Sequence, residues 1–138
     1  MKESAFRFSK PVLKNIEYRI NDEFQSDQKV HFHSHFHRNV IRSEDSCAAV
    51  VELTIEIGVD KRSVNAPFAL LFVIMANFEW DETYDSETIN NLLLINAPSL
   101  LLGYARPIIS NITSNSIGQY DLPFMNFVSS DDILSTEE

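Results

Sequence analysis

Four stretches of the chain combine apolar residues with the spacing of β-strands. They lie at residues 12–20, 30–40, 47–59 and 68–80. Successive side chains of a strand point to opposite faces, so an alternation of apolar and polar residues predicts a strand with one buried face. The alternation is clearest in 47–59, where one face is Ala49, Val51, Leu53, Ile55 and Ile57 and the other Glu52, Thr54 and Glu56.

The first and the last of these stretches carry different patterns. In 12–20 the apolar face is formed by Val12, Ile16, Tyr18 and Ile20. In 68–80 both faces are apolar, with Phe68, Leu70, Phe72, Ile74, Phe78 and Trp80 on one and Leu71, Val73 and Met75 on the other. Antiparallel sheets usually leave one face in water. Residues 68–80 are therefore either a central strand covered on both sides or a strand whose second face is closed by another subunit or a bound chain.

A helical pattern follows the strands. Ser86 can cap a short helix over residues 87–95, and Asn96 and Pro98 predict a break and a restart, because proline is favoured in the first turn of a helix. From there apolar residues recur at steps of three and four, which predicts one buried helical face. That face comprises Leu93, Ala97, Leu101, Tyr104, Ile108 and Ile112.

A proline inside this helix predicts a kink. Pro107 removes the hydrogen bond to the carbonyl group of Gly103 and crowds that residue, so we expect the bend between the two. Gly118 is the expected end of the helix.

Strands followed by helix predict an α+β fold: a four-stranded antiparallel sheet with a long kinked C-terminal helix on one face. A chain of 138 residues is of single-domain length. We place the domain at residues 1–128, and we expect the acidic residues 129–138 to form a mobile tail.

Composition narrows the classes of function. The net charge of −9 disfavours nucleic acid, whose phosphates bind clustered basic residues. Cys47 is the only cysteine, which fits a reducing compartment. The N-terminal residues lack the apolar core of a signal peptide, and no apolar run approaches the roughly 18 residues of a membrane span. We therefore expect a cytoplasmic protein.

The four histidines are concentrated in one short run: His31, His33, His35 and His37. In a strand they would form one file, with Phe32 and Phe36 on the opposite face. Such a file can bind zinc or copper, although a catalytic metal would need a further fixed ligand and an open pocket. The file equally fits a solvated strand face or a pH-sensitive surface. No cofactor is expected.

The most specific motifs lie in the last third of the chain. Tyr104-Ala105-Arg106 falls in the predicted helix, and a Leu-Pro-x-x-Asn-Phe segment covers residues 122–127. With these motifs the chain resembles the SecB family of export chaperones, which hold unfolded polypeptides. The resemblance covers residues 6–127, and the strands agree in order and length rather than in residues.

The resemblance implies a homotetramer with long apolar grooves that hold unfolded clients, without ATP or a catalytic residue. Four residues of the apolar helix face are the expected oligomer interface: Leu101, Tyr104, Ile108 and Ile112. Aromatic side chains dominate interface energetics, so the expected client-binding residues lie in the fourth strand and the tail: Phe68, Phe72, Ile74, Phe78, Trp80, Phe124 and Phe127. Each of these also fits a plain core position.

Three positions depart from the export-type pattern. Acidic residues that dock the Sec translocase motor in that family correspond here to Asn15, Arg19 and Leu71. The family resemblance implies the Sec translocase motor as a partner, but these three residues do not support docking of the motor. The departures are similar to SecB-like companions of toxin–antitoxin modules, whose client is an antitoxin. Clients of either kind, antitoxin or preprotein, remain open, as do a metal-binding protein built on the histidine row and a structural oligomerisation module.

Overall fold

The computed structural model describes residues 5–60 and 63–114 and the backbone of residues 133–137. The elements in chain order are β1 (Phe6–Phe8), β2 (Val12–Ile20), β3 (His33–Arg42), β4 (Ala48–Ile57), β5 (Phe68–Trp80), α1 (Ser86–Asn91), the π-helical turn η1 (Leu92–Asn96), α2 (Ala97–Thr113) and β6 (Ile133–Glu137). The four predicted strands are all present as β2 to β5.

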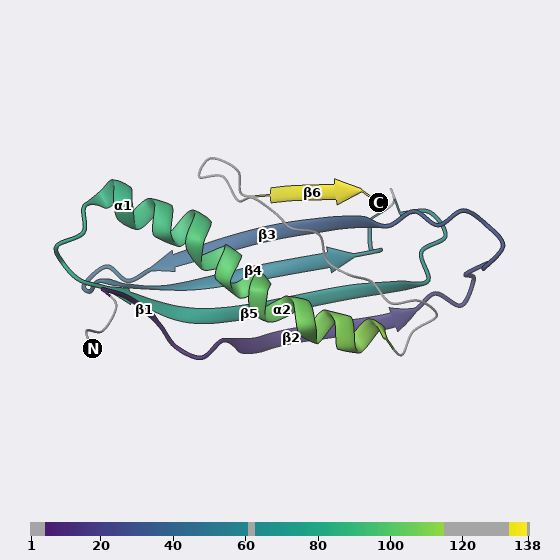
Figure 1. Ribbon diagram of the computed structural model, residues 1–138, viewed down its shortest axis with the longest axis horizontal. Coiled ribbons are helices and arrows are strands. Elements are labelled where there is room, and N and C mark those ends of the chain that lie inside the picture. The colour runs from purple at the N-terminus through teal and green to yellow at the C-terminus, as the bar shows by residue number, and fades with distance from the viewer. Residues whose placement is uncertain (1–4, 61–62, 115–132, 138) are drawn as a thin grey trace.

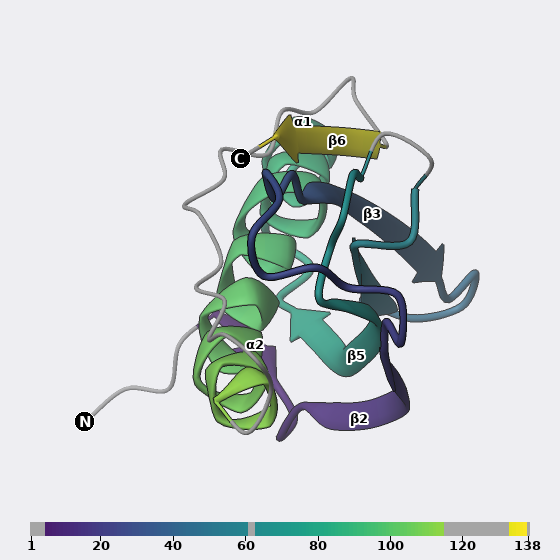
Figure 2. The same cartoon turned by 90° about the vertical axis from the view of Figure 1, so that its right-hand side faces the viewer.

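The strands form one antiparallel sheet, and the helices cross one of its faces (Figures 1 and 2). β5 pairs with β4 on one side, and β1 and β2 pair with successive parts of β5 on the other. β3 pairs with β4 along one edge and with β6 along the other. The predicted α+β fold class is confirmed, and β1 and β6 extend the expected sheet at its two edges.

The C-terminal residues add the last of these strands. Of the tail expected at 129–138, the structure describes the backbone of Ile133–Glu137, which forms β6 and pairs antiparallel with the beginning of β3. Gly118, the expected helix end, lies outside the described residues, and α2 ends at Thr113.

The core lies between the sheet and the helices. Register pairs Leu53 with Ile74 and Ile55 with Phe72, so the apolar faces of β4 and β5 form one surface. The helices cover it with fully or nearly fully buried side chains, namely Ile89, Leu93, Ala97, Leu101, Leu102, Ala105 and Ile109. The predicted alternation of 47–59 is therefore confirmed, because its apolar face is the floor of this core.

The helical segment is continuous where a break was expected. α1 is capped by Asp85 rather than Ser86, and the Asp85 Oδ1 atom accepts a hydrogen bond from the Thr88 backbone N–H at 2.7 Å. Asn96 and Pro98 lie at the junction of η1 and α2 without interrupting the helix, and Pro107 lies inside α2.

A bulge changes the phase of β2. Leu13 pairs with Ile74 and Asn15 with Val73, so Lys14 is an extra residue on its strand. After the bulge, Ile16, Tyr18 and Ile20 face the helices as expected. Before it, Leu13 rather than Val12 belongs to that face, because Val12 pairs with Met75 on the opposite side of the sheet.

The helical segment Ser86–Thr113 is long and apolar enough to cross a membrane by length and composition alone. A single helix of this kind is weak evidence for insertion, since core helices of soluble proteins pass the same test, and this one packs along the sheet (Figure 1).

Candidate functional site

The aromatic residues expected in the client groove lie in the core of the monomer. Relative exposure is 1% for Phe68, 0% for Phe72 and Phe78, 1% for Ile74 and 6% for Trp80. All five lie on the face of β5 that the helices cover. The structure thus places these side chains in the core, which was the other reading of each position. Phe124 and Phe127 lie outside the described residues.

The apolar surface that remains open lies beside the helix rather than beneath it. Side chains on β1 and β2 face the same side as the core but extend past the cover of α2. Together with one residue of α2 they form what we call the apolar seam: Phe8, Leu13, Ile16, Ile20 and Tyr104. Their relative exposures are 42%, 41%, 37%, 45% and 46% respectively.

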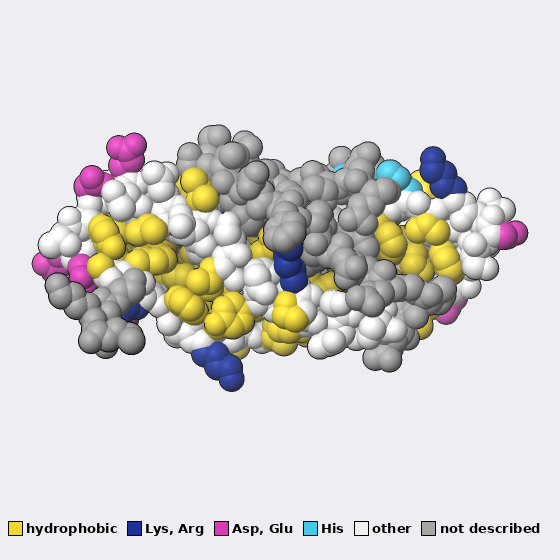
Figure 3. Space-filling model, viewed as in Figure 1, with side chains coloured by type: hydrophobic (Ala, Val, Ile, Leu, Met, Phe, Trp, Pro, Cys, Tyr) yellow, Lys and Arg dark blue, Asp and Glu magenta, His cyan; other side chains and the backbone are white. Residues whose placement is uncertain are grey.

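The seam is continuous with the core. The rings of Phe8 and Tyr104 meet edge to face with centroids 6.4 Å apart, and Phe8 lies 6.0 Å from the buried ring of Phe78. Farther along β2, Tyr18 lies 5.6 Å from the buried ring of Phe68. Figure 3 shows hydrophobic side chains along this face of the molecule with few charged groups among them. Exposed apolar patches rimmed by polar residues mark interaction sites.

The strand that carries the seam is also an edge of the sheet. β2 pairs with β5, and among the residues that the structure describes no strand pairs with its outer edge. The backbone N–H and C=O groups of such an edge can take up an added strand. An extended polypeptide could therefore contact apolar side chains and free backbone groups at the same place.

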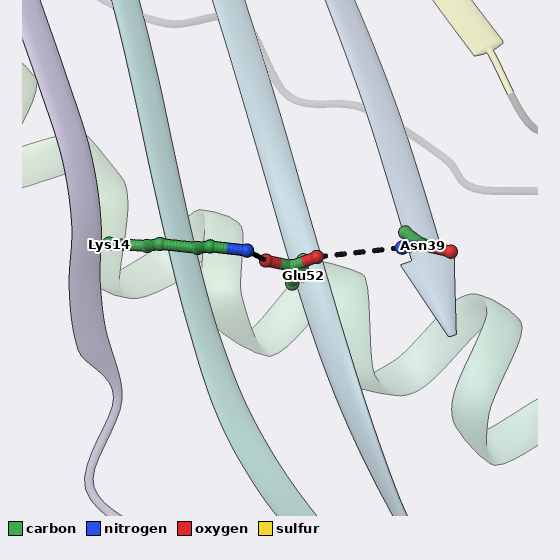
Figure 4. A network of polar contacts seen from close by, with 3 residues as sticks. All are labelled: Lys14, Asn39 and Glu52. Carbon is green, nitrogen blue, oxygen red and sulfur yellow. Dashed lines mark hydrogen bonds and ion pairs between the residues drawn. The ribbon is translucent and has the colours of Figure 1, made fainter. Parts of the chain in front are cut away.

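The opposite face of the sheet is polar. Lys14 on β2 reaches across β5 to form an ion pair with Glu52 on β4 (Figure 4). Asn39 on β3 donates a hydrogen bond to the other Glu52 oxygen at 3.4 Å. The second apolar face predicted for 68–80, Leu71, Val73 and Met75, lies on this side and is half-buried among polar neighbours. Val12 and Ile41 lie on this face as well and are 53% and 54% exposed, so apolar side chains are interspersed among its polar ones.

The expected oligomer residues divide between two faces of α2. Leu101 is fully buried against the sheet, whereas Tyr104 is 46% exposed and Ile108 and Ile112 are half-buried. The buried face of α2 runs instead through Leu101, Leu102, Ala105, Ile109 and Thr113. Tyr104, Ile108 and Ile112 therefore form a partly open stripe along the flank of the helix.

The three expected motor-docking positions do lie together. Asn15, Arg19 and Leu71 all belong to the polar face, since Asn15 pairs with Val73 and Leu71 with Glu17. A shallow hollow of about 630 Å³ there is lined in part by Glu17, Arg19 and Leu71. Its charges are of both signs, which differs from a purely acidic docking patch.

The histidine file is confirmed in part. Alternation on β3 places His33, His35 and His37 on the polar face and Phe36 in the core. His31 precedes the strand and makes an isolated bridge with Val64. The file is graded in exposure, from 1% for His33 to an exposed His37. Among the described residues, the acidic group that joins this file is Asp60, which sequence reasoning did not single out.

Sequence reasoning also missed the seam. Its signal was present in the apolar side of 12–20, but an edge strand and a covered strand share that pattern. The pairing order shows that β2 is an edge strand of the described sheet, and the exposures of Leu13, Ile16 and Ile20 show that α2 leaves it open.

No protein-family model matches the chain, and no curated protein does. Among solved structures, the chain is similar to the SecB-like chaperone of Mycobacterium tuberculosis, solved in complex with a ChAD peptide from the HigA1 antitoxin. The TM-score is 0.69 at 13% identity, over 88% of this chain and 91% of that one. It also resembles a protein of unknown function from Streptococcus agalactiae, with a TM-score of 0.44 at 14% identity over 86% and 97% of the two chains. The first likeness shows that this chain has a SecB-like fold.

Proposed function

We propose that this protein is an ATP-independent holdase of the SecB-like kind, which binds unfolded polypeptides at the apolar seam. The observation that carries the proposal is the pairing of exposed apolar side chains with an open strand edge on a SecB-like fold. A holdase needs broad apolar contact, because its clients have little in common apart from being unfolded. Binding of this kind needs neither a catalytic residue nor a cofactor.

Two classes of client fit the seam, an antitoxin of a toxin–antitoxin module and preproteins bound for Sec-dependent export. The structurally similar mycobacterial chaperone was solved with an antitoxin peptide, which supports the first class. The mixed charges around Arg19 and Leu71 weaken the case for docking the export motor. We therefore favour an antitoxin client and a cytoplasmic location.

We further propose that the chain forms a homo-oligomer, as a tetramer of the SecB-like kind. The partly open stripe of Tyr104, Ile108 and Ile112 supports this, because closed symmetric assemblies are the common way to bury such surfaces. The stripe and the seam share Tyr104, so a subunit interface would border the client surface.

The decisive experiment compares neighbouring residues on opposite faces of β2. Leu13 belongs to the seam and is 41% exposed, whereas Val12 lies on the polar face and is 53% exposed. Suppression of aggregation of a chemically unfolded protein should fall in Leu13→Ser, and fall further in Leu13→Ser with Ile16→Ser. Val12→Ser should behave as wild type, and circular dichroism should show that all variants are folded.

Two outcomes would decide against the proposal. A wild-type protein that suppresses no aggregation would favour a structural oligomerisation module. Equal losses in Leu13→Ser and Val12→Ser would place the client surface elsewhere. Binding of an antitoxin peptide and of an unfolded preprotein, measured side by side with the wild-type protein, would then separate the two classes of client.

A further inference from the structure

Three metal-ligating side chains meet at the beginning of β3. His33 and His35 come from this strand, and Asp60 comes from the connection between β4 and β5. One ligand atom of each lies within 4.8 Å of the others. The two imidazole rings stand edge to face with centroids 4.5 Å apart, and the His35 Nε2 and Asp60 Oδ2 atoms are 2.6 Å apart.

The convergence follows from strand geometry and a returning loop. Residues two apart in a strand share a face, which brings His33 and His35 together. β4 is antiparallel to β3, and Ser34 pairs with Ile57, so the chain leaves β4 beside the first residues of β3. Asp60, three residues later, returns to the face that carries the histidines.

Hydrogen bonds join the connection that carries Asp60 to residues 31 and 33, at and just before the start of β3. The Gly58 N–H donates to the carbonyl oxygen of His33 at 3.1 Å, and the His33 N–H donates to the Ser63 hydroxyl oxygen at 2.8 Å. Val64 and His31 exchange two hydrogen bonds of 2.8 Å. These contacts lie on both sides of Asp60 in the sequence and fix the flanking backbone, and the contact with His35 Nε2 holds the Asp60 carboxylate beside the imidazole before any ligand binds. Preorganised ligands of this kind give precise metal sites.

We propose that His33, His35 and Asp60 bind one zinc ion. Two imidazole nitrogens and one carboxylate oxygen are a ligand set suited to zinc, which takes three protein ligands and leaves a fourth position for water. The site is sheltered yet reachable, because His33 is 1% exposed while the side chains of His35 and Asp60 are 24% and 25% exposed. His31 and His37 lie outside this cluster.

The ion would act as a clamp. It would add a link between β3 and Asp60, beside the hydrogen bonds that already join Gly58, Ser63 and Val64 to residues 31 and 33. A ligand that binds the folded chain and not the unfolded one adds to the free energy of unfolding. The proposed role is therefore to hold the β4–β5 connection against the sheet, on the face opposite the seam.

The test measures zinc binding in a chain that has no histidine tag and was treated with a chelator. Calorimetry should give one zinc per wild-type chain. Asp60→Asn and His35→Gln should each weaken the affinity by at least about tenfold, which corresponds to about 1.4 kcal/mol. His37→Gln is the matched control, since it removes an imidazole from the same file outside the cluster, and it should bind as the wild type does.

A second measurement reports on the clamp itself. Lys61 and Arg62 are the two trypsin sites that directly follow Asp60. Zinc should slow cleavage there in the wild type and in His37→Gln, and leave it unchanged in Asp60→Asn. Asp60→Asn keeps the size of the side chain, so its fold can be checked by circular dichroism independently of the metal.

Any of three results would overturn the proposal. They are a wild-type chain that binds no stoichiometric zinc, a folded Asp60→Asn variant with wild-type affinity, and a His37→Gln variant as impaired as His35→Gln. The last result would show diffuse binding to the whole histidine file.

Discussion

The guanidinium group of Arg38 on β3 donates a hydrogen bond of 2.5 Å to the main-chain carbonyl oxygen of Leu94 in η1. In a regular α-helix the donor to this carbonyl would be the N–H of residue 98. That residue is a proline and has no N–H. A buried arginine of the sheet thus supplies a hydrogen-bond donor at the turn where the helix lacks one, and this bond links the sheet to the helix layer.

We expect Arg38→Met to lower the free energy of unfolding by about 1–3 kcal/mol, because it leaves a carbonyl of the helix without this donor. Urea denaturation measures the change. Pro98→Ala returns an N–H at the required place, so the double variant should lose less than the single variant does. Equal losses with and without Pro98 would show that the Arg38 bond does not replace the missing helical one.

The two described glycines form a contrasting pair. Gly58 has φ +73°, and a Cβ atom built there would lie 2.2 Å from the carbonyl oxygen of Phe68, whereas one at Gly103 has no neighbour within 4 Å. Gly58→Ala should cost about 1–3 kcal/mol or more. Gly103→Ala lies in an exposed part of α2 and should stabilise by about 0.5–1 kcal/mol. Thermal melts of the two variants, moving in opposite directions, check both.

A substitution in the core and one in the seam should differ in their effects on stability and on client binding. Phe72 is fully buried, so Phe72→Ala should cost about 3–5 kcal/mol. Leu13→Ser changes an exposed position and should cost less than about 1 kcal/mol. The melting temperature should therefore fall steeply in Phe72→Ala. Leu13→Ser should lose client binding with little change in melting temperature.

The α1 cap has a defined pH dependence. Hydrogen bonds from the backbone and side chain of Thr88 lower the pKa of Asp85 below its ordinary value of 3.8. The cap therefore stabilises fully above pH 3.8 and is lost as the pH falls through the lowered pKa. Asp85→Asn keeps a capping oxygen without the charge. The difference in melting temperature between wild type and Asp85→Asn should be constant near neutral pH and change only below pH 4.

A charge on the flank of α2 tests the oligomer. Tyr104→Glu places an acidic group in the open stripe, and it should dissociate the proposed tetramer, as measured by light scattering at micromolar concentration. Ser99→Glu adds the same charge at an exposed position of the same helix and should leave the assembly intact. A wild-type chain that is a stable monomer would contradict the assembly altogether.

The sequence predicted the elements better than it predicted which residues are covered. Alternation identified the buried face of β4, because each apolar residue there meets another across the sheet. The predicted helix face is correct for Leu93, Ala97 and Leu101, which are buried. Beyond Leu101 it lies one step away from the buried face. The reason is that Ala105 and Thr113 are small or polar and carry a weak apolar signal, whereas the partly open Tyr104 and Ile108 carry a strong one. Asp60 and His35 are in contact although they lie 25 positions apart in the sequence. Local sequence patterns carry no information about such pairs.

The extra residue at Lys14 has a consequence for any residue-by-residue alignment of this strand. Counting by twos from Val12 leads to the wrong side of the sheet beyond the bulge, because Val12 and Ile16 lie on opposite faces although they are an even number of residues apart. A relative that lacks the insertion would match this chain correctly on one side of Lys14 and be displaced by one residue on the other. An alignment of this strand must therefore place a gap at Lys14 before any residue in it is compared with a functional position elsewhere.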